Sequence, residues 1–186
     1  MSLSRRHIEG VVFLVAFALT IPAANWLIGN VGTKCIPNGP CLIPVAPGLM
    51  GPSGVVMIGL ALVLRDLVQR RLGVRWAVAA ILAGALLSGL VAPAKLVVAS
   101  IVAFLIAELA DLAVFTPLQR RGLVLAVAAS SLVGLVVDSM IFLQLAFGNL
   151  DFLMGQVVGK AWMVLAALPF VAWLRRRDER IGLQPA

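Results

Sequence analysis

The chain has 186 residues, of which 62% are hydrophobic and only 12% are charged, and its formal net charge is +7. Soluble domains are closer to half apolar, with about a quarter of their residues charged, so this composition excludes a soluble globular domain. The positive charge does not indicate a nucleic-acid-binding protein, because the basic residues cluster at the ends of apolar runs and form no continuous binding face.

Six apolar runs follow one another along the chain, separated by proline, glycine and charged residues. Each is close to the roughly 20 residues that a helix needs to cross the hydrocarbon core of a bilayer. The runs are too long and too continuous for barrel strands, so strands are not expected in them. The sequence therefore predicts an all-α membrane protein, with one bundle of six transmembrane helices in a single domain over residues 1–186. The predicted spans are residues 8–28, 51–69, 74–91, 96–118, 123–147 and 152–174.

Most basic residues lie near the two chain termini and around every second loop between the spans. The other set of loops holds only Lys34 and Lys95. Because loops rich in arginine and lysine stay in the cytoplasm, both chain termini of this multi-pass protein are predicted to be cytoplasmic. The arginines on the predicted cytoplasmic side are Arg5, Arg6, Arg65, Arg70, Arg71, Arg75, Arg120, Arg121, Arg175, Arg176, Arg177 and Arg180.

Four ionisable residues lie well inside the apolar runs, away from the ends of the predicted spans: Glu108, Asp111, Asp138 and Lys160. A charge at membrane depth costs several kcal/mol and usually marks a substrate or ion path. With a helical rise of about 1.5 Å per residue, Asp138 and Lys160 lie at similar depth in the outer half of the membrane, where they can pair. Glu108 lies near the midplane without an evident basic partner, so it is the residue that most needs a substrate or a proton to explain it.

Two interpretations remain open for each charged pair. Arg65 and Asp66, at the depth of Asp111, form either a polar cluster at the cytoplasmic end of the second span or an ordinary charge pair at a helix end. Asp138 and Lys160 either serve a substrate or only fix the register of two helices.

Polar and aromatic residues recur at three- or four-residue steps in the last three spans, so each set shares one helix face. Facing one another, the sets would line a cavity with donors, acceptors and flat apolar rings, which suits a small planar polar solute. The alternatives are that the phenylalanines pack or face lipid and that the serines serve close helix packing. The sets are Ser100, Phe104, Glu108, Asp111 and Phe115; Ser131, Gly134, Asp138 and Phe142; and Gln156 with Lys160.

Cys35 and Cys41 flank a short segment rich in proline and glycine in the first outer loop. In an oxidising compartment they would form a disulfide, and two unpaired small residues are an equal alternative. No metal site is predicted, because His7, the one histidine, lies on the other side of the membrane. The sequence has no phosphate-binding glycine loop and no Ser/His/Asp set, so neither an enzyme nor a cofactor is expected.

Five features stand in order along the chain: Asn25, the segments 65–73 (RDLVQRRLG), 107–118 (AELADLAVFTPL) and 130–142 (SSLVGLVVDSMIF), and Lys160. Together they resemble the VUT family of queuosine precursor transporters, over all but the tails of the chain. The resemblance implies a six-helix bundle of the bacterial cytoplasmic (inner) membrane. It would import a 7-deazaguanine precursor of queuosine, the modified base of certain tRNAs, and the cyano form is expected. The resemblance also implies that the family's polar positions are Asn25, Asp66, Glu108, Asp111, Asp138 and Lys160.

We therefore expect a transporter that moves a deazapurine base across the lipid bilayer and binds no nucleic acid. Glu108 or Asp138 would hold the guanine-like edge, Lys160 or Gln156 would donate to its carbonyl, and an aromatic ring would stack on the base. Burial favours the protonated form of a carboxylic acid, so proton coupling is a further hypothesis. The alternatives are the substrate-binding subunit of a multisubunit ATP-driven vitamin-type importer and a non-transporting membrane scaffold. The oligomeric state, a homodimer included, stays open.

Overall fold

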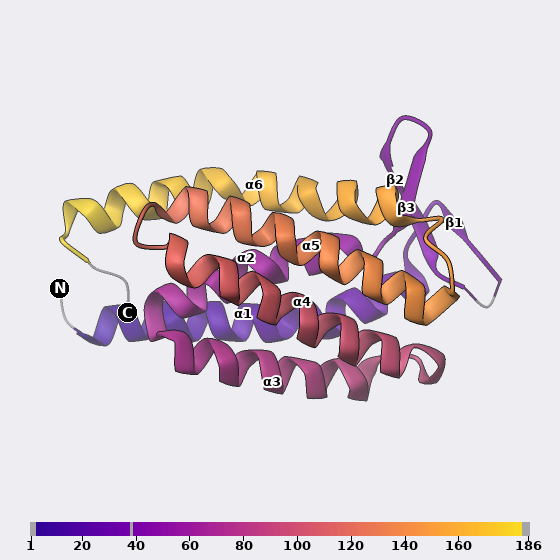
Figure 1. The fold of residues 1–186 in the computed structure, drawn as a ribbon, viewed down its shortest axis with the longest axis horizontal. Coiled ribbons are helices and arrows are strands. Elements are labelled where there is room, and N and C mark those ends of the chain that lie inside the picture. The colour runs from indigo at the N-terminus through magenta and orange to yellow at the C-terminus, as the bar shows by residue number, and fades with distance from the viewer. Residues whose placement is uncertain (1–2, 38, 184–186) are drawn as a thin grey trace.

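The computed structural model describes residues 3–37 and 39–183. In these residues six long helices lie side by side along one axis and form a single bundle (Figure 1). A short 3₁₀ turn, Ala94–Leu96, leads into the fourth helix. The helices are α1 (Leu3–Asn30), α2 (Val55–Leu72), α3 (Val74–Val91), α4 (Val97–Leu118), α5 (Leu123–Phe147) and α6 (Leu153–Arg180).

α2 is the central helix of the bundle, and it carries four charged residues. Its residues contact each of the other five long helices. Among the described residues, five helices are long and apolar enough to cross a membrane, and α2 is not one of them because it carries Arg65, Asp66, Arg70 and Arg71. All four of these side chains are buried. The charges of α2 are therefore held inside the bundle.

The outer surface of the bundle is apolar. Leu90 and Val98 are 83% and 68% exposed, whereas Lys160 is fully buried. Large apolar side chains outside and charges inside are the reverse of the pattern in soluble proteins, and they match a helical protein surrounded by lipid. The fold is that of a multi-pass helical membrane protein.

The two ends of the bundle differ in character. The start of α1, the end of α6 and the arginine-rich α2–α3 and α4–α5 turns lie at one end, which we call the arginine end (Figure 1). A small sheet lies at the other end, which we call the sheet end. By the positive-inside rule, the arginine end is expected to face the cytoplasm.

The segment between α1 and α2 forms an antiparallel sheet for which the sequence has no strand signal. Gly48 provides the positive φ, 71°, of the turn between its last two strands. The predicted start of the second span at residue 51 is wrong, because Gly51 pairs with Ile43 in the sheet and α2 begins only at Val55. The strands, in spatial order, are β1 (Lys34–Cys35), β2 (Cys41–Ala46) and β3 (Leu49–Pro52).

Glycines let this sheet pack directly against the beginning of α6. A side chain on Gly155 would overlap the carbonyl oxygen of Met50, and one on Gly51 would overlap the backbone of Gly155. Trp162, further along α6, is 57% exposed and its Nε1 donates to the carbonyl oxygen of Val45 at 2.9 Å. The sheet is thus held across the end of the bundle, and Trp162 faces outward, away from any central cavity.

Cys35 and Cys41 are joined by a disulfide that links β1 to β2. Reduction of this bond is expected to lower the free energy of unfolding by about 2 kcal/mol, the loop-closure contribution of so short a ring. Thermal unfolding with and without reductant measures the loss. The Cys35→Ser/Cys41→Ser variant is the control, because its unfolding should not respond to reductant. An unchanged unfolding midpoint in the reduced wild type would contradict the prediction.

Candidate functional site

A cavity lies between the helices toward the sheet end. The centre of a water molecule can occupy about 70 Å³ of it, several times the roughly 10–15 Å³ that one water needs. This is room for a small molecule and not for a peptide. All six long helices contribute to the wall, which is formed by Thr20, Ile21, Ala24, Asn25, Ile28, Pro52, Gly54, Val55, Ile58, Ala61, Ser88, Leu96, Ser100, Phe104, Asp138, Phe142 and Gln156.

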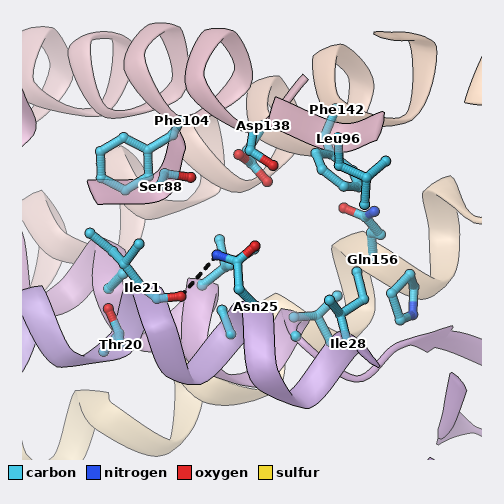
Figure 2. Close-up of a pocket in the computed structure, with 17 residues that line it drawn as sticks. Thr20, Ile21, Asn25, Ile28, Ser88, Leu96, Phe104, Asp138, Phe142 and Gln156 are labelled. Carbon is cyan, nitrogen blue, oxygen red and sulfur yellow. Dashed lines mark hydrogen bonds between the residues drawn. The ribbon is translucent and has the colours of Figure 1, made fainter. Parts of the chain in front are cut away.

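Asp138 on α5 and Asn25 on α1 face one another across this cavity (Figure 2). The Asn25 Nδ2 donates to the carbonyl oxygen of Ile21 at 3.0 Å, which leaves its Oδ1 for a ligand. The Asp138 Oδ2 accepts a hydrogen bond from Lys160 at 2.5 Å. Its other oxygen, Oδ1, is therefore the acceptor that Asp138 can offer to a ligand.

Lys160 on α6 lies behind the cavity wall. Its Nζ donates to Asp138 Oδ2 at 2.5 Å, to Ser139 Oγ at 2.7 Å and to Gln156 Oε1 at 2.8 Å. An ammonium group has three hydrogens, so all of them are used within the protein. Lys160 therefore acts on the cavity through the side chains it holds, and in this structure it has no hydrogen to donate to a ligand carbonyl.

The same hydrogen bonds orient Gln156. Because its Oε1 accepts from Lys160, its Nε2 is the group that remains for the cavity. The cavity wall thus presents two acceptors, Asp138 Oδ1 and Asn25 Oδ1, and one amide donor, in a setting that is otherwise mostly apolar (Figure 2).

Two phenylalanine rings border the cavity. The Phe104 ring lies 6.0 Å from that of Phe17, and the Phe142 ring meets that of Phe147 edge-on at 6.1 Å. Each ring is therefore fixed by a neighbouring ring and still contributes to the wall, where it can cover the face of a flat ligand.

Three hydroxyl side chains also line the cavity: Thr20, Ser88 and Ser100. The sequence gives no sign of a role for Thr20, because a threonine within a helix commonly bonds to its own backbone, as Thr20 does to the carbonyl oxygen of Phe17 at 2.6 Å. Ser88 lies on α3, and its place in the wall depends on how α3 is rotated.

Glu108 and Asp111 do not line the cavity. They belong to a buried group nearer the arginine end, which we call the Arg65 cluster: Arg65, Asp66, Glu108 and Asp111. The Arg65 Nη2 lies 2.8 Å from Asp66 Oδ1 and 2.7 Å from Asp111 Oδ1, and its Nε lies 3.1 Å from Glu108 Oε2. The prediction that Glu108 lacks a basic partner is wrong, because the long arginine side chain reaches it from α2.

The alternative of an ordinary charge pair at a helix end is also wrong for Arg65 and Asp66. α2 continues to Leu72, and both side chains are 0% exposed. Phe115 on α4 lies against the guanidinium group, with 5.7 Å between the Arg65 Cζ and the ring centroid. Phe115 is therefore neither lipid-facing nor available to stack on a ligand in the cavity.

A short hydrogen-bonded chain leads from the Arg65 cluster toward the arginine end. The Arg65 Nη1 donates to Gln69 Oε1 at 3.1 Å, and Gln69 Nε2 donates to Thr116 Oγ1 at 3.0 Å. Gln69 and Thr116 line an open cleft in which the centre of a water molecule can occupy about 1060 Å³. We call it the basic cleft, because its wall includes Arg70, Arg120, Arg121 and Arg175.

Residues 90–174 match the family model described as "Putative vitamin uptake transporter". The resemblance to the VUT family is confirmed over this segment. The VUT match includes α4, α5 and most of α6, and with them Glu108, Asp111, Asp138 and Lys160. No curated protein and no solved structure matches the chain. The chain is thus a multi-pass membrane protein with a segment similar to vitamin uptake transporters.

The residues predicted to bind the substrate do not form one site. Glu108 and Asp111 instead join Arg65 and Asp66, for which the sequence predicts a separate cluster at the cytoplasmic end. Ser131 belongs to neither hydrogen-bond network among the described residues, since its buried Oγ has no partner there. The cavity wall has Asn25, Phe104, Asp138, Phe142 and Gln156, with Lys160 behind it; the Arg65 cluster has Arg65, Asp66, Glu108 and Asp111.

Proposed function

We propose that the protein imports a 7-deazaguanine base, a precursor of queuosine, across the bacterial cytoplasmic membrane, and that the base binds beside Asp138. The observation that carries this proposal is the free Oδ1 of Asp138, which faces Asn25 across a small and mostly apolar cavity. A guanine-like edge has two N–H donors, at N1 and at the exocyclic amine. Asp138 Oδ1 would accept from N1–H, and Asn25 Oδ1 would accept the hydrogen of the exocyclic amine that points away from N1.

The remaining groups of the wall complete this binding mode. Gln156 Nε2 would donate to the ring carbonyl, and Phe104 or Phe142 would cover the face of the base. Asp138 is a better candidate than Glu108 for the guanine-like edge, because Asp138 lines the cavity whereas Glu108 pairs with Arg65 outside the cavity wall.

Thermal unfolding of the purified protein tests the binding. A 7-cyano-7-deazaguanine concentration of about 100 times the Kd should stabilise the fold by about 2.7 kcal/mol, and adenine should have much less effect. Gln156→Ala should weaken the binding about tenfold, the contribution of one buried hydrogen bond. Gln144→Ala is the matched control, because Gln144 is exposed on α5. A wild-type unfolding midpoint that no deazapurine changes would refute the proposal.

Uptake into liposomes separates this function from the alternatives. A protein that transports alone moves the base into liposomes that contain no other protein. The substrate-binding subunit of an ATP-driven importer would bind the base there without moving it, and a scaffold would do neither. Purified wild-type protein in liposomes, with labelled base outside, is therefore the deciding measurement.

A further inference from the structure

The Arg65 cluster has more negative than positive groups. One guanidinium faces three carboxylates, and no side chain of the four is more than 3% exposed. With every group ionised, the cluster would hold two negative charges in excess. Buried charge without a counter-ion is strongly destabilising, and most of all at membrane depth.

The neighbouring charges do not correct this imbalance. Asp138, on α5, is close enough to Glu108 to interact with it electrostatically, and it adds a further negative charge. Lys160, on α6, is already paired with Asp138. The described parts of α1 and α3 at this depth have no ionisable side chain.

The hydrogen bonds of the cluster are also inconsistent with ionisation of all three carboxylic acids. The Ser130 hydroxyl donates to Asp66 Oδ2 at 2.9 Å, and it is also within reach of the Asp111 carboxyl group. One hydroxyl has one hydrogen, so it cannot serve both carboxylates. Asp111 Oδ2 is buried, and no described residue donates a hydrogen bond to it. An ionised Asp111 would therefore leave a buried carboxylate oxygen without a donor.

We propose that the Arg65 cluster is a proton-binding site, with the proton on Asp111. The added hydrogen supplies the missing donor: the Asp111 O–H donates to Ser130 Oγ, and the Ser130 hydroxyl continues to donate to Asp66. The excess charge falls by one. Building on the proposed function, we further propose that this proton moves inward with each base.

The position of the cluster suits such a role. It lies between the cavity, where Asp138 is near Glu108, and the basic cleft, to which Gln69 and Thr116 connect it. A proton that enters from the cavity forms an O–H bond at Asp111. When the cluster opens to the basic cleft that bond breaks, the proton passes to water, and Asp111 becomes a carboxylate again.

Infrared spectroscopy of the purified protein tests proton binding without any substrate. The wild type at neutral pH should show the carbonyl-stretch band of a buried protonated carboxylic acid, shifted in deuterated water. Asp111→Asn should remove this band, and Asp151→Asn, in the exposed α5–α6 turn, should leave it unchanged. Absence of the band from the wild type at neutral pH would overturn the proposal whether or not the variants fold, and so would a band that persists in Asp111→Asn.

Liposome uptake tests the coupling, and it separates this inference from the proposed function. An acidic exterior should drive accumulation of the deazaguanine base by the wild type. Asp111→Asn should still exchange labelled for unlabelled base but should not accumulate it. Uptake by the wild type that is independent of the pH gradient would refute the coupling and leave the proposed function standing. Absence of base binding and uptake would refute the proposed function, and the infrared band would still decide whether the cluster holds a proton.

Discussion

Replacement of Asp138 with asparagine is expected to abolish binding of a deazaguanine base and to lower the free energy of unfolding by about 3–5 kcal/mol. The binding is lost because the amide cannot supply the charged acceptor for the N–H edge of the base. The stability is lost because the ammonium group of Lys160, which is 0% exposed, keeps its charge without a counter-ion. Thermal unfolding gives the stability and ligand-induced stabilisation gives the binding.

A second substitution separates these two effects. Asp138→Asn/Lys160→Met removes the buried charge together with its partner, so the double variant should regain most of the lost stability, because a buried ion pair can often be replaced by apolar groups without loss. It should still not bind the base. Wild-type affinity in the double variant would show that Asp138 is only a structural partner of Lys160.

Replacement of Arg65 with methionine is expected to have the largest effect on stability, and most of the protein should fail to reach a folded, monodisperse state. The substitution leaves three buried carboxylates, Asp66, Glu108 and Asp111, without their only cation in the cluster. Breaking one buried pair costs about 3–5 kcal/mol, comparable with the total stability of many proteins. The yield and unfolding midpoint in detergent measure the result.

Two further variants test whether the loss of stability comes from removing the buried guanidinium group of Arg65. Arg175→Met removes an arginine whose ion pair with Glu179 is about half exposed, 46% and 57%, so it should change stability by no more than about 1 kcal/mol. Arg65→Lys keeps the charge but loses the planar fork of donors, and should be intermediate. Equal stability of Arg65→Met and Arg175→Met would show that the Arg65 cluster does not support the fold.

Depth in the membrane could be predicted from the sequence, because the rise of a helix fixes it. That is why the pairing of Asp138 with Lys160 and the shared depth of Arg65 and Asp111 follow from counting residues. The partner of Glu108 could not be predicted from depth. Arg65 and Glu108 differ in depth along their helices, and only the length and direction of the arginine side chain bring them together.

The rotation of each helix about its axis could not be predicted, and it decides which polar residues share a site. Thr20 and Ser88 reach the cavity because of the way α1 and α3 are turned, whereas Glu108 is turned toward α2. The sheet could not be predicted from the sequence for another reason. Its strands are short and interrupted by proline and glycine, so β-propensity gives no signal.

The central position of α2 has a consequence for how the protein enters the membrane during synthesis. Arg65 and Asp66 each oppose insertion of an isolated helix, by about 2.5–3.5 kcal/mol near its centre. The residues that compensate Arg65 from outside α2 are on α4, which follows it in the chain. α2 should therefore stay at the membrane surface or within the translocation machinery until α4 has been made. The helix on which the whole bundle packs then settles only after two later helices, α3 and α4, have been made.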